Sequence, residues 1–358
     1  MSIRILEQEP LAPHTMYKIG GPARFFVEVR NSKELCEALA FAAKNKFVPF
    51  APSLNLHQKD LARSASANFS AGFFILGAGS NILVSDKGFG GVVIKIKGGE
   101  VKFDGERMIA DAGVMMARAA HEAQIAGLAG FEWAIGVPGT IGGSVRGNAG
   151  CFGGEMKDVI EKVSILNFSR REVGIPTSLS EEFNEASGQF SKTEELNNQQ
   201  CQFGYRYSIF KKHPEWVIIS ATLKLKKGDP EVIREEVKRI ALNRTAKQDI
   251  GSKSCGCIFK NIPWSREDID KNKILTRFPD MPSSGTVDGI PVSYLISQAG
   301  LKGRRAGCVF VSPKHANFFV NDGGASAEEV IMLIGIVKDA VQRKFGILLE
   351  EEIQYVGF

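Results

Sequence analysis

Three short stretches of this chain carry residue types that could act on an anionic substrate. Residues 201–212 read CQFGYRYSIFKK, and Arg206 stands there between two tyrosines, where it could clamp an anion. An aromatic strand with an arginine on its surface fits the same letters, and the local sequence alone favours that strand. Residues 254–261 read SCGCIFKN. Cys255 and Cys257 lack the companion ligands of a structural zinc site, so we expect no metal, one buried thiol and one thiol facing a pocket.

The third stretch is a run of three glutamates, residues 350–352, near the C-terminus. The run is typical of a solvated charged surface, but Glu352 also begins an alternating strand pattern that ends at Val356. Because side chains alternate across a strand, Glu352, Gln354 and Val356 share one face. If that face points inward, Glu352 is a carboxyl group held away from water.

Two glycine-rich segments could position these side chains or bind their ligand. Residues 127–155 hold ten glycines in 29 residues, against 38 in the chain of 358. Glycine permits positive φ angles and a close approach of the backbone to a ligand. The segment fits a backbone wall shaped for a flat or anionic ligand and, equally, a set of tight turns in a β domain.

The second segment, residues 77–81 (GAGSN), follows a buried strand expected over residues 73–76. Ile82 stands where a Rossmann fingerprint has its third glycine, and the segment matches no Walker motif. Backbone N–H groups of such a turn can bind a pyrophosphate, although a plain strand-to-turn junction fits the local sequence better. His315 lies between strands expected over residues 308–311 and 318–320, where a lone histidine is more often a structural hydrogen-bonding group.

Helix and strand signals frame these segments. The predicted helices have clear ends: an N-cap at Asn31, residues 114–125 closed by Gly127, a start at Asp229 running to about residue 244, and a capping box at Ser326 with Gly346 as the stop. Further strands are expected over residues 25–29, 92–97, 163–168 and 216–226, and residues 92–97 should have one wet face. Three polar stretches, residues 53–70, 169–200 and 264–289, read as surface loops.

Composition limits the class of protein. A chain of 358 residues, 44% hydrophobic and 24% charged, predicts two or three domains. The net charge of +5 is spread along the chain, which is too mild for nucleic acid but suits a small anionic substrate. Sparse cysteines argue against a disulfide framework. The N-terminus shows no secretory signal, and the longest apolar run is too short to span a bilayer, so we expect a cytoplasmic protein.

Taken together and in order, these stretches resemble the UDP-N-acetylenolpyruvoylglucosamine reductases, FAD enzymes that make UDP-N-acetylmuramate for peptidoglycan. The resemblance covers most of the chain outside the three polar stretches. The chain is similar to the branch of the family that has the shorter loop before the CGCIFKN motif. Each motif is weak alone, but eight in register are specific: YKIGGPARFF, ILGAGSNILVSDKGFGGVVI, GVPGTIGGSVRGNAGCFGGE, FGYRYSIFK, CGCIFKN, AGLKG, KHANFFVN and LEEEIQYVG.

The resemblance implies an α+β protein with the vanillyl-alcohol-oxidase (PCMH) type of FAD-binding fold. It places two FAD-binding subdomains over residues 1–97 and 98–227, a substrate-binding α+β domain over residues 228–346, and a C-terminal strand, residues 347–358, that carries the catalytic glutamate. It also implies non-covalent FAD, NADPH as co-substrate and a UDP-sugar substrate. We expect a monomer with no nucleic-acid or membrane partner.

Residue roles carry over from the resemblance one position at a time. Arg206 and Glu352 match the catalytic arginine and glutamate, and Cys257 falls where many members have the proton-donating serine. Arg146 lies in a run, residues 144–146, where the family more often has small apolar residues. The residues implied to hold the FAD pyrophosphate are Gly77, Ala78, Gly79, Ser80, Asn81 and Ile82. Those implied to line the flavin are Pro138, Gly139, Thr140, Ile141, Gly142, Gly143, Asn148, Ala149 and Gly150. The implied substrate contacts are Tyr205, Lys247, Asn261 and His315.

The implied reaction passes a hydride from flavin N5 to C3 of the enolpyruvyl group and a proton from Cys257 to C2. Arg206 by its charge, and Glu352 by a donated hydrogen bond if protonated, would stabilise the enolate-like intermediate. Two other classes stay open. An oxidase of the same fold is one, although none of the five histidines lies in the FAD-lining motifs. A non-catalytic nucleotide-binding module is the other, and the three candidate catalytic residues argue against it.

Overall fold

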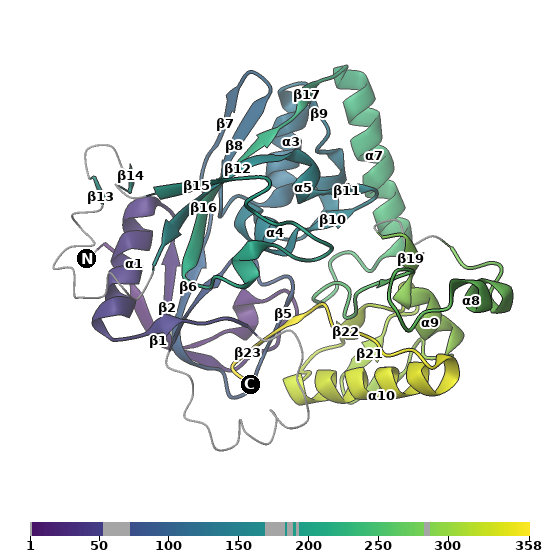
Figure 1. The fold of residues 1–358 in the computed structure, drawn as a ribbon. Helices are drawn as coiled ribbons and strands as arrows, with labels where there is room; N and C mark the ends of the chain where they lie inside the picture. The colour runs from purple at the N-terminus through teal and green to yellow at the C-terminus, as the bar shows by residue number, and fades with distance from the viewer. Residues whose placement is uncertain (1, 53–71, 169–182, 185–188, 191–192, 283–286) are drawn as a thin grey trace.

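The computed structural model describes residues 2–52, 72–168, 183–184, 189–190, 193–282 and 287–358. Within these residues the chain forms two five-stranded sheets and a third, helix-rich part (Figure 1). The first sheet has the order β1-β2-β6-β4-β3, with β1 antiparallel and the rest parallel. Its strands are β1 (Ile5–Pro10), β2 (Pro22–Val29), β3 (Val48–Pro49), β4 (Gly72–Leu76) and β6 (Phe89–Ile96).

Strand β6 occupies the centre of this sheet and is buried on both faces. Val92 and Ile94 pack on one face in the cluster that contains α1 (Ser32–Lys44), and Val93 packs in a different cluster. The predicted wet face is therefore wrong at Val93, where the sheet is covered on both sides, but it holds at the end of the stretch, where Lys95 is half-buried and Lys97 is exposed. The predicted cap of α1 is confirmed, since the Asn31 side chain accepts a hydrogen bond from the Glu34 N–H.

The second sheet is antiparallel, with the order β15-β12-β16-β8-β7. Residues 193–197 form its edge strand, so the surface loop predicted across residues 169–200 is wrong there. Leu196 is the one buried side chain of this strand, and the other four residues are exposed. The strand is therefore as polar in composition as a loop. Elements of this part are β7 (Val101–Asp104), β8 (Arg107–Asp111), α3 (Met116–Ile125), η2 (Glu132–Gly136), α4 (Ile141–Gly147), α5 (Met156–Val159), β12 (Ile160–Asn167), β15 (Thr193–Asn197) and β16 (Trp216–Lys224).

The third part contains most of the remaining helices. The stretch 264–289, predicted to be a loop, contains the helix α8 (Lys271–Arg277), which Asp270 caps. No residue of α8 is buried, so the helix lacks the apolar stripe by which a helix is recognised in a sequence. The caps predicted at Asp229, Ser326 and Gly346 are confirmed. Its elements are α7 (Pro230–Lys247), β18 (Ile262–Pro263), α8 (Lys271–Arg277), β19 (Gly289–Ile290), α9 (Val292–Gln298), β20 (Arg305–Ala306), β21 (Val309–Val311), β22 (Phe319–Asn321) and α10 (Ala327–Phe345).

The C-terminus returns from this third part to the first (Figure 1). Strand β23 (Gln354–Val356) pairs in parallel with β5 (Ile82–Val84), directly after the 77–81 segment. Asp86, just beyond β5, accepts hydrogen bonds of 2.9 Å from the backbone N–H of Ala327 at the start of α10. These contacts hold the third part against the first sheet.

The remaining short elements connect these parts. Of the three polar stretches, residues 53–70 lie outside the described residues. Among the described helices, none is both long and apolar enough to cross a membrane. The short elements are η1 (Ala12–His14), β9 (Leu128–Ala129), β10 (Gly150–Cys151), β11 (Gly154–Glu155), β13 (Phe183–Asn184), β14 (Gln189–Phe190), η4 (Ile209–Lys211) and β17 (Lys226–Lys227).

Candidate active site

Two loops, residues 77–82 and 138–143, face each other and together form what we call the glycine wall. A Cβ atom on Gly77 would lie 2.6 Å from the Thr140 hydroxyl oxygen, and one on Gly139 would lie 3.4 Å from the Ser80 hydroxyl oxygen. Backbone hydrogen bonds anchor the second loop beside α3, with the Met116 N–H donating to the Gly139 carbonyl at 3.0 Å. The loops meet this closely because glycine leaves room between their backbones.

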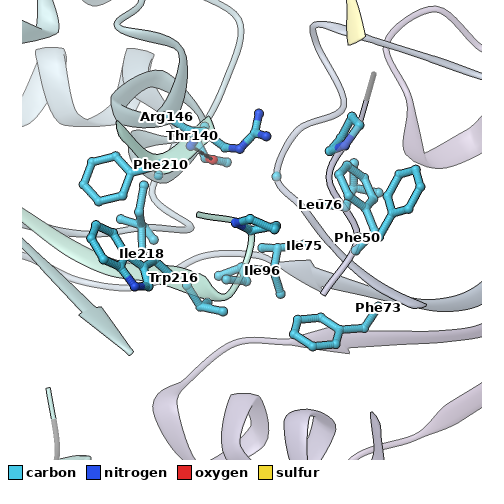
Figure 2. Close-up of a pocket in the computed structure, with 18 residues that line it drawn as sticks. Phe50, Phe73, Ile75, Leu76, Ile96, Thr140, Arg146, Phe210, Trp216 and Ile218 are labelled. Atoms are coloured by element: carbon cyan, nitrogen blue, oxygen red, sulfur yellow. Dashed lines mark hydrogen bonds between the residues drawn. The ribbon is translucent and has the colours of Figure 1, made fainter. Parts of the chain in front are cut away.

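A cavity opens beside the glycine wall, between the two sheets (Figure 2). Phe73 and Leu76 of β4 line one side, and Trp216 and Ile218 of β16 line the other. The cavity holds roughly 660 Å³ of empty space, part of it open to solvent. Gly77, Thr140, Gly142 and Gly143 of the wall, together with Arg146, form its remaining lining near α4. A mainly apolar lining with a few polar groups near α4 suits a large aromatic ligand.

Arg206, Cys257 and Glu352 meet near the end of the glycine-rich segment, and we call them the catalytic corner. The Nε atom of Arg206 lies 2.7 Å from Oε1 of Glu352, and both side chains are largely enclosed. Arg206 also donates to the Gly150 carbonyl at 3.1 Å. The Glu352 N–H donates to the Ile258 carbonyl at 2.7 Å, which brings the glutamate beside Cys257. Each of the three comes from a different stretch of the sequence.

The backbone of Arg206 is strained. Its φ angle is +55°, in the left-handed region that non-glycine residues rarely adopt. The segment is a tight turn, with the Gly204 N–H donating to the Tyr207 carbonyl at 2.9 Å, so the aromatic strand favoured by the local sequence is wrong. Lys211 donates to the Arg206 carbonyl at 2.6 Å, and Asn148 donates to the Gly204 carbonyl at 2.8 Å. These bonds offset a strain of about 1–3 kcal/mol.

The electrostatics of the catalytic corner keep its thiol protonated. Burial, reinforced by the Glu352 carboxylate, raises the pKa of Cys257 to about 12. Burial opposes the charge on Arg206, but Glu352 outweighs burial and leaves the pKa of the guanidinium above its ordinary value. Nη1 of Arg206 is buried and has no hydrogen-bond partner among the described residues. The corner therefore offers a proton and an unused cationic donor.

Glu352 reaches this place in a different way from the one expected. It lies two residues before β23, not on the strand itself. The Asn81 side chain donates to the Glu352 carbonyl at 3.3 Å, and the Gln354 N–H donates to the Asn81 carbonyl at 3.1 Å. Glu351 is the more deeply buried neighbour and bonds to Lys338 and Tyr355. The 77–81 segment thus holds Glu352 through Asn81 and lines the cavity through Gly77.

The four substrate contacts implied by the resemblance fall in different settings. The Tyr205 hydroxyl accepts a hydrogen bond of 3.0 Å from the Asn261 N–H, and burial raises the pKa of Tyr205 to about 12. His315 stacks edge-on against Phe318, whose backbone pairs with that of Cys257. Burial lowers the pKa of His315 to about 4. Lys247 is exposed at the last residue of α7, so the structure brings Tyr205, Asn261 and His315 toward the corner but leaves Lys247 at its edge.

Asn148, which the resemblance places among the flavin-lining residues, is buried within the protein beside the Arg206 turn. Its side chain is fully buried and bonds to Glu155, to the Gly204 carbonyl and to the Lys157 N–H. Its φ angle of +43° ends α4 in the left-handed conformation that asparagine tolerates. Asn148 therefore ties α4 to the Arg206 turn.

Two basic residues near the corner were missed by the sequence interpretation. Lys211 supports the Arg206 turn, and nothing in the letters FKK distinguishes it from a surface lysine. Arg244 is buried, and its guanidinium donates to the Cys151 sulfur at 3.3 Å. A signal for Arg244 did exist, because Ile233, Ile240 and Arg244 share one face of α7. The Arg244 charge reaches Cys257 and opposes part of the rise in its pKa.

The residues of the wall and cavity fit FAD. The cavity is lined mainly by apolar side chains, and the turn at residues 77–81 is of the kind whose backbone N–H groups can bind a pyrophosphate. Near the corner, Nη1 of Arg206 and Nε of Arg244 are buried without partners among the described residues. Orphaned donors of this kind suit the polar edge of a ring system or a substrate anion.

Comparisons with known proteins agree with this geometry. Residues 248–356 match the model for the UDP-N-acetylenolpyruvoylglucosamine reductase C-terminal domain, and residues 57–169 match an FAD binding domain. The chain is 33% identical to a UDP-N-acetylenolpyruvoylglucosamine reductase of Carboxydothermus hydrogenoformans, over 100% of this chain and 95% of that protein. It is 34% identical to one from Caldicellulosiruptor bescii, over 99% and 91%.

A solved structure gives the same result. The crystal structure of UDP-N-acetylenolpyruvylglucosamine reductase from Thermus caldophilus is 27% identical, covers 99% of both chains and has a TM-score of 0.66. The expected fold is confirmed: α+β, with the vanillyl-alcohol-oxidase type of FAD-binding unit and a C-terminal domain. The chain belongs to the UDP-N-acetylenolpyruvoylglucosamine reductase family.

Proposed function

We propose that this chain is an FAD enzyme that uses NADPH to reduce UDP-N-acetylglucosamine enolpyruvate to UDP-N-acetylmuramate. One observation carries the proposal. The Arg206–Glu352 ion pair, with its 2.7 Å contact, lies beside a protonated Cys257. A cation and a proton donor at one point suit an enolpyruvyl group, which develops negative charge on its carboxylate side and then takes a proton.

Arg206 is the residue we assign to the substrate carboxylate. Its Nη1 atom is enclosed and has no partner among the described residues, so an oxygen of the substrate can take that donor. Glu352 and the Gly150 carbonyl hold the guanidinium in place before the substrate arrives. Because the charge is preorganised, it stabilises the enolate-like transition state by several kcal/mol, of the order of 3. Tyr205 and Asn261 complete the substrate side through their hydrogen bond.

Cys257 is the residue we assign to proton delivery at C2. A thiol whose pKa is raised to about 12 is protonated at neutral pH, and an enolate carbon is basic enough to take its proton. The chemistry that FAD supplies when bound is hydride transfer, from NADPH and then to C3 of the enolpyruvyl group. The residues of the glycine wall hold the cofactor, and those of the corner hold and protonate the substrate.

The proposal includes the division of the chain. We assign FAD-binding subdomains to residues 1–97 and 98–227, a substrate domain to residues 228–346, and the catalytic strand to residues 347–358. A hydrophobic cluster whose buried members all lie between Met108 and Leu225 supports the middle subdomain. We also propose a monomer that works in the cytoplasm without nucleic-acid partners. Six free cysteines are in keeping with a reducing compartment.

An anaerobic absorbance experiment tests the proposed function. The purified protein should show FAD bands that bleach on adding NADPH and return on adding UDP-N-acetylglucosamine enolpyruvate. Acid should release the flavin into the supernatant, since the proposed cofactor is not covalently held. Bands that return only with oxygen, with peroxide as product, would instead identify an oxidase of the same fold.

A further inference from the structure

One positively charged side chain in the cavity has no counter-ion among the residues that the structure describes. Arg146, in the last turn of α4, lines the cavity together with Gly77 and Thr140 and extends toward the open space (Figure 2). Within the described part of the chain, its guanidinium donates to the neutral side-chain oxygen of Gln354 and forms no ion pair. The Ser208 hydroxyl donates to the Arg146 carbonyl at 2.7 Å, which fixes the backbone from which the side chain extends.

A second cation adds to this charge. Lys211 lies close enough to Arg146 that burial, followed by the Arg146 charge, lowers the pKa of Lys211 to about 8. Burial also lowers the pKa of Arg146 to about 10. Glu352 is the carboxylate that acts on Lys211, but it is already in contact with Arg206 at 2.7 Å. This end of the cavity therefore holds positive charge that the described part of the chain does not neutralise.

The position of Gln354 places this charge over the first loop of the glycine wall. The Gln354 N–H donates to the Asn81 carbonyl at 3.1 Å, and Gln354 pairs with Ile82 between β23 and β5. An arginine beside a glycine-containing turn is a strong arrangement for phosphate oxygens, because guanidinium binds them through two parallel hydrogen bonds and backbone N–H groups of such a turn can bind them too.

We propose that Arg146 binds the diphosphate of the dinucleotide cofactor, with Gln354 holding its guanidinium in position. The inference rests on the proposed function, since it takes FAD as the ligand of this cavity. A UDP-sugar also carries a diphosphate. The cofactor is favoured because Arg146 shares the cavity lining with Gly77 and Thr140, whereas that lining includes neither Arg206 nor Cys257.

Binding of FAD to the apoprotein tests the proposal without any measurement of turnover. Arg146→Gln should weaken FAD binding by roughly ten- to hundredfold, as expected for the loss of a charged hydrogen bond. The affinity of wild type for FAD should fall as salt is added, and the slope should be shallower in the variant, since oxidised flavin is neutral and the diphosphate carries the charge. Arg118→Gln, on the exposed side of α3, is the matched control and should behave as wild type.

A second variant separates an electrostatic role from a structural one. Gln354→Glu would give Arg146 a carboxylate partner, so the apoprotein should keep its melting temperature while FAD binding weakens. If the pair were merely structural, the stronger bond would leave FAD affinity unchanged, and that result would overturn the proposal. If Arg146→Gln left FAD affinity unchanged but raised the KM for the UDP-sugar, Arg146 would bind the substrate, and the cofactor assignment would be overturned. A wild-type apoprotein that binds no FAD would count against the proposed function itself.

Discussion

In the glycine wall two short segments meet where a glycine of one faces a hydroxyl side chain of the other, whereas the catalytic corner takes one side chain from each of three distant segments. A side chain added at Gly77 would lie 2.6 Å from Thr140, so the wall works because side chains are absent. In the proposed reaction the corner works through charge and a proton, with Arg206 and Glu352 in contact at 2.7 Å beside Cys257. Adding a side chain should therefore damage the wall, and removing a functional group should damage the corner. The first change should weaken FAD binding, and the second should slow reoxidation of the flavin by the substrate.

The largest expected effect in the corner is that of Cys257→Ala. The variant should keep FAD and its reduction by NADPH, while reoxidation by the enolpyruvyl substrate slows by roughly a hundred- to ten-thousandfold, the usual contribution of general acid catalysis. Single-turnover absorbance measures both steps. Cys257→Ser should retain substantial activity through its hydroxyl group. The control is Cys255→Ala, which changes the buried thiol two residues away. If Cys255→Ala lost the reoxidation step and Cys257→Ala kept it, the proton donor would have been assigned to the wrong cysteine.

Glu352→Gln should produce the next largest effect. The variant removes the charge that faces the Arg206 Nε atom while keeping a side chain of similar size. Reoxidation by substrate should slow by roughly a hundred- to thousandfold, since one preorganised electrostatic group is lost. Reduction by NADPH needs no enolate stabilisation and should stay near the wild-type rate. Glu350→Gln, on the exposed neighbour, serves as the control, and equal effects in both variants would make Glu352 part of a solvated charged surface.

In the glycine wall, Gly77→Ala should act on binding instead of rate. The new Cβ would meet the Thr140 hydroxyl, and overpacking of this kind costs about 1–3 kcal/mol. FAD affinity should fall by roughly tenfold, while the reoxidation rate per bound flavin stays near that of wild type. Gly335→Ala, in α10, meets nothing within 4 Å and is the control. A Gly77→Ala protein that binds FAD normally but turns over slowly would contradict the division between wall and corner.

The smallest effect links the two regions through Lys211. In the unfolded chain Lys211 keeps its ordinary pKa of 10.5, but in the folded protein burial lowers it to about 8. Between these values the unfolded state binds more protons, so the stability of wild type relative to Lys211→Met should rise as pH increases from 8 to 10.5. Urea unfolding of the apoproteins at both ends of that range measures the change. The exposed neighbour gives the control Lys212→Met, and an equal stability difference at both pH values would show that Lys211 is not held in this buried setting.

The same comparison explains which features the sequence could predict. Helix ends were predictable because caps such as Asn31, Ser326 and Gly346 act on residues a few positions away. The glycine-rich segments of the wall could be recognised for a similar reason, since their glycines lie close together in the sequence, but the local sequence left their role open. The wet face expected for residues 92–97 was wrong at Val93, because burial of a central strand depends on what covers the sheet, and held at Lys97 beyond the end of β6. The edge strand β15 was missed because its polar side chains reflect its exposed position.

The geometry of the corner could not be predicted from local sequence. Around Arg206 the letters favour a strand, yet the chain makes a strained turn that Lys211 and Asn148 stabilise from outside. Glu352 was placed on the last strand, but it lies two residues before β23 and is held by Asn81. These positions depend on contacts between segments far apart in the chain. The family resemblance supplied the identities of the residues, and the fold shows how they meet.

A stopped-flow comparison of the two half-reactions in wild type, Cys257→Ala and Gly77→Ala, all saturated with FAD, tests the central claim most directly. The account predicts that NADPH reduces the flavin at similar rates in all three proteins. It predicts that UDP-N-acetylglucosamine enolpyruvate reoxidises the flavin rapidly in wild type and in Gly77→Ala. In Cys257→Ala, reoxidation should be slower by about a hundredfold or more. Equal reoxidation rates in wild type and Cys257→Ala would contradict the assignment of the catalytic corner.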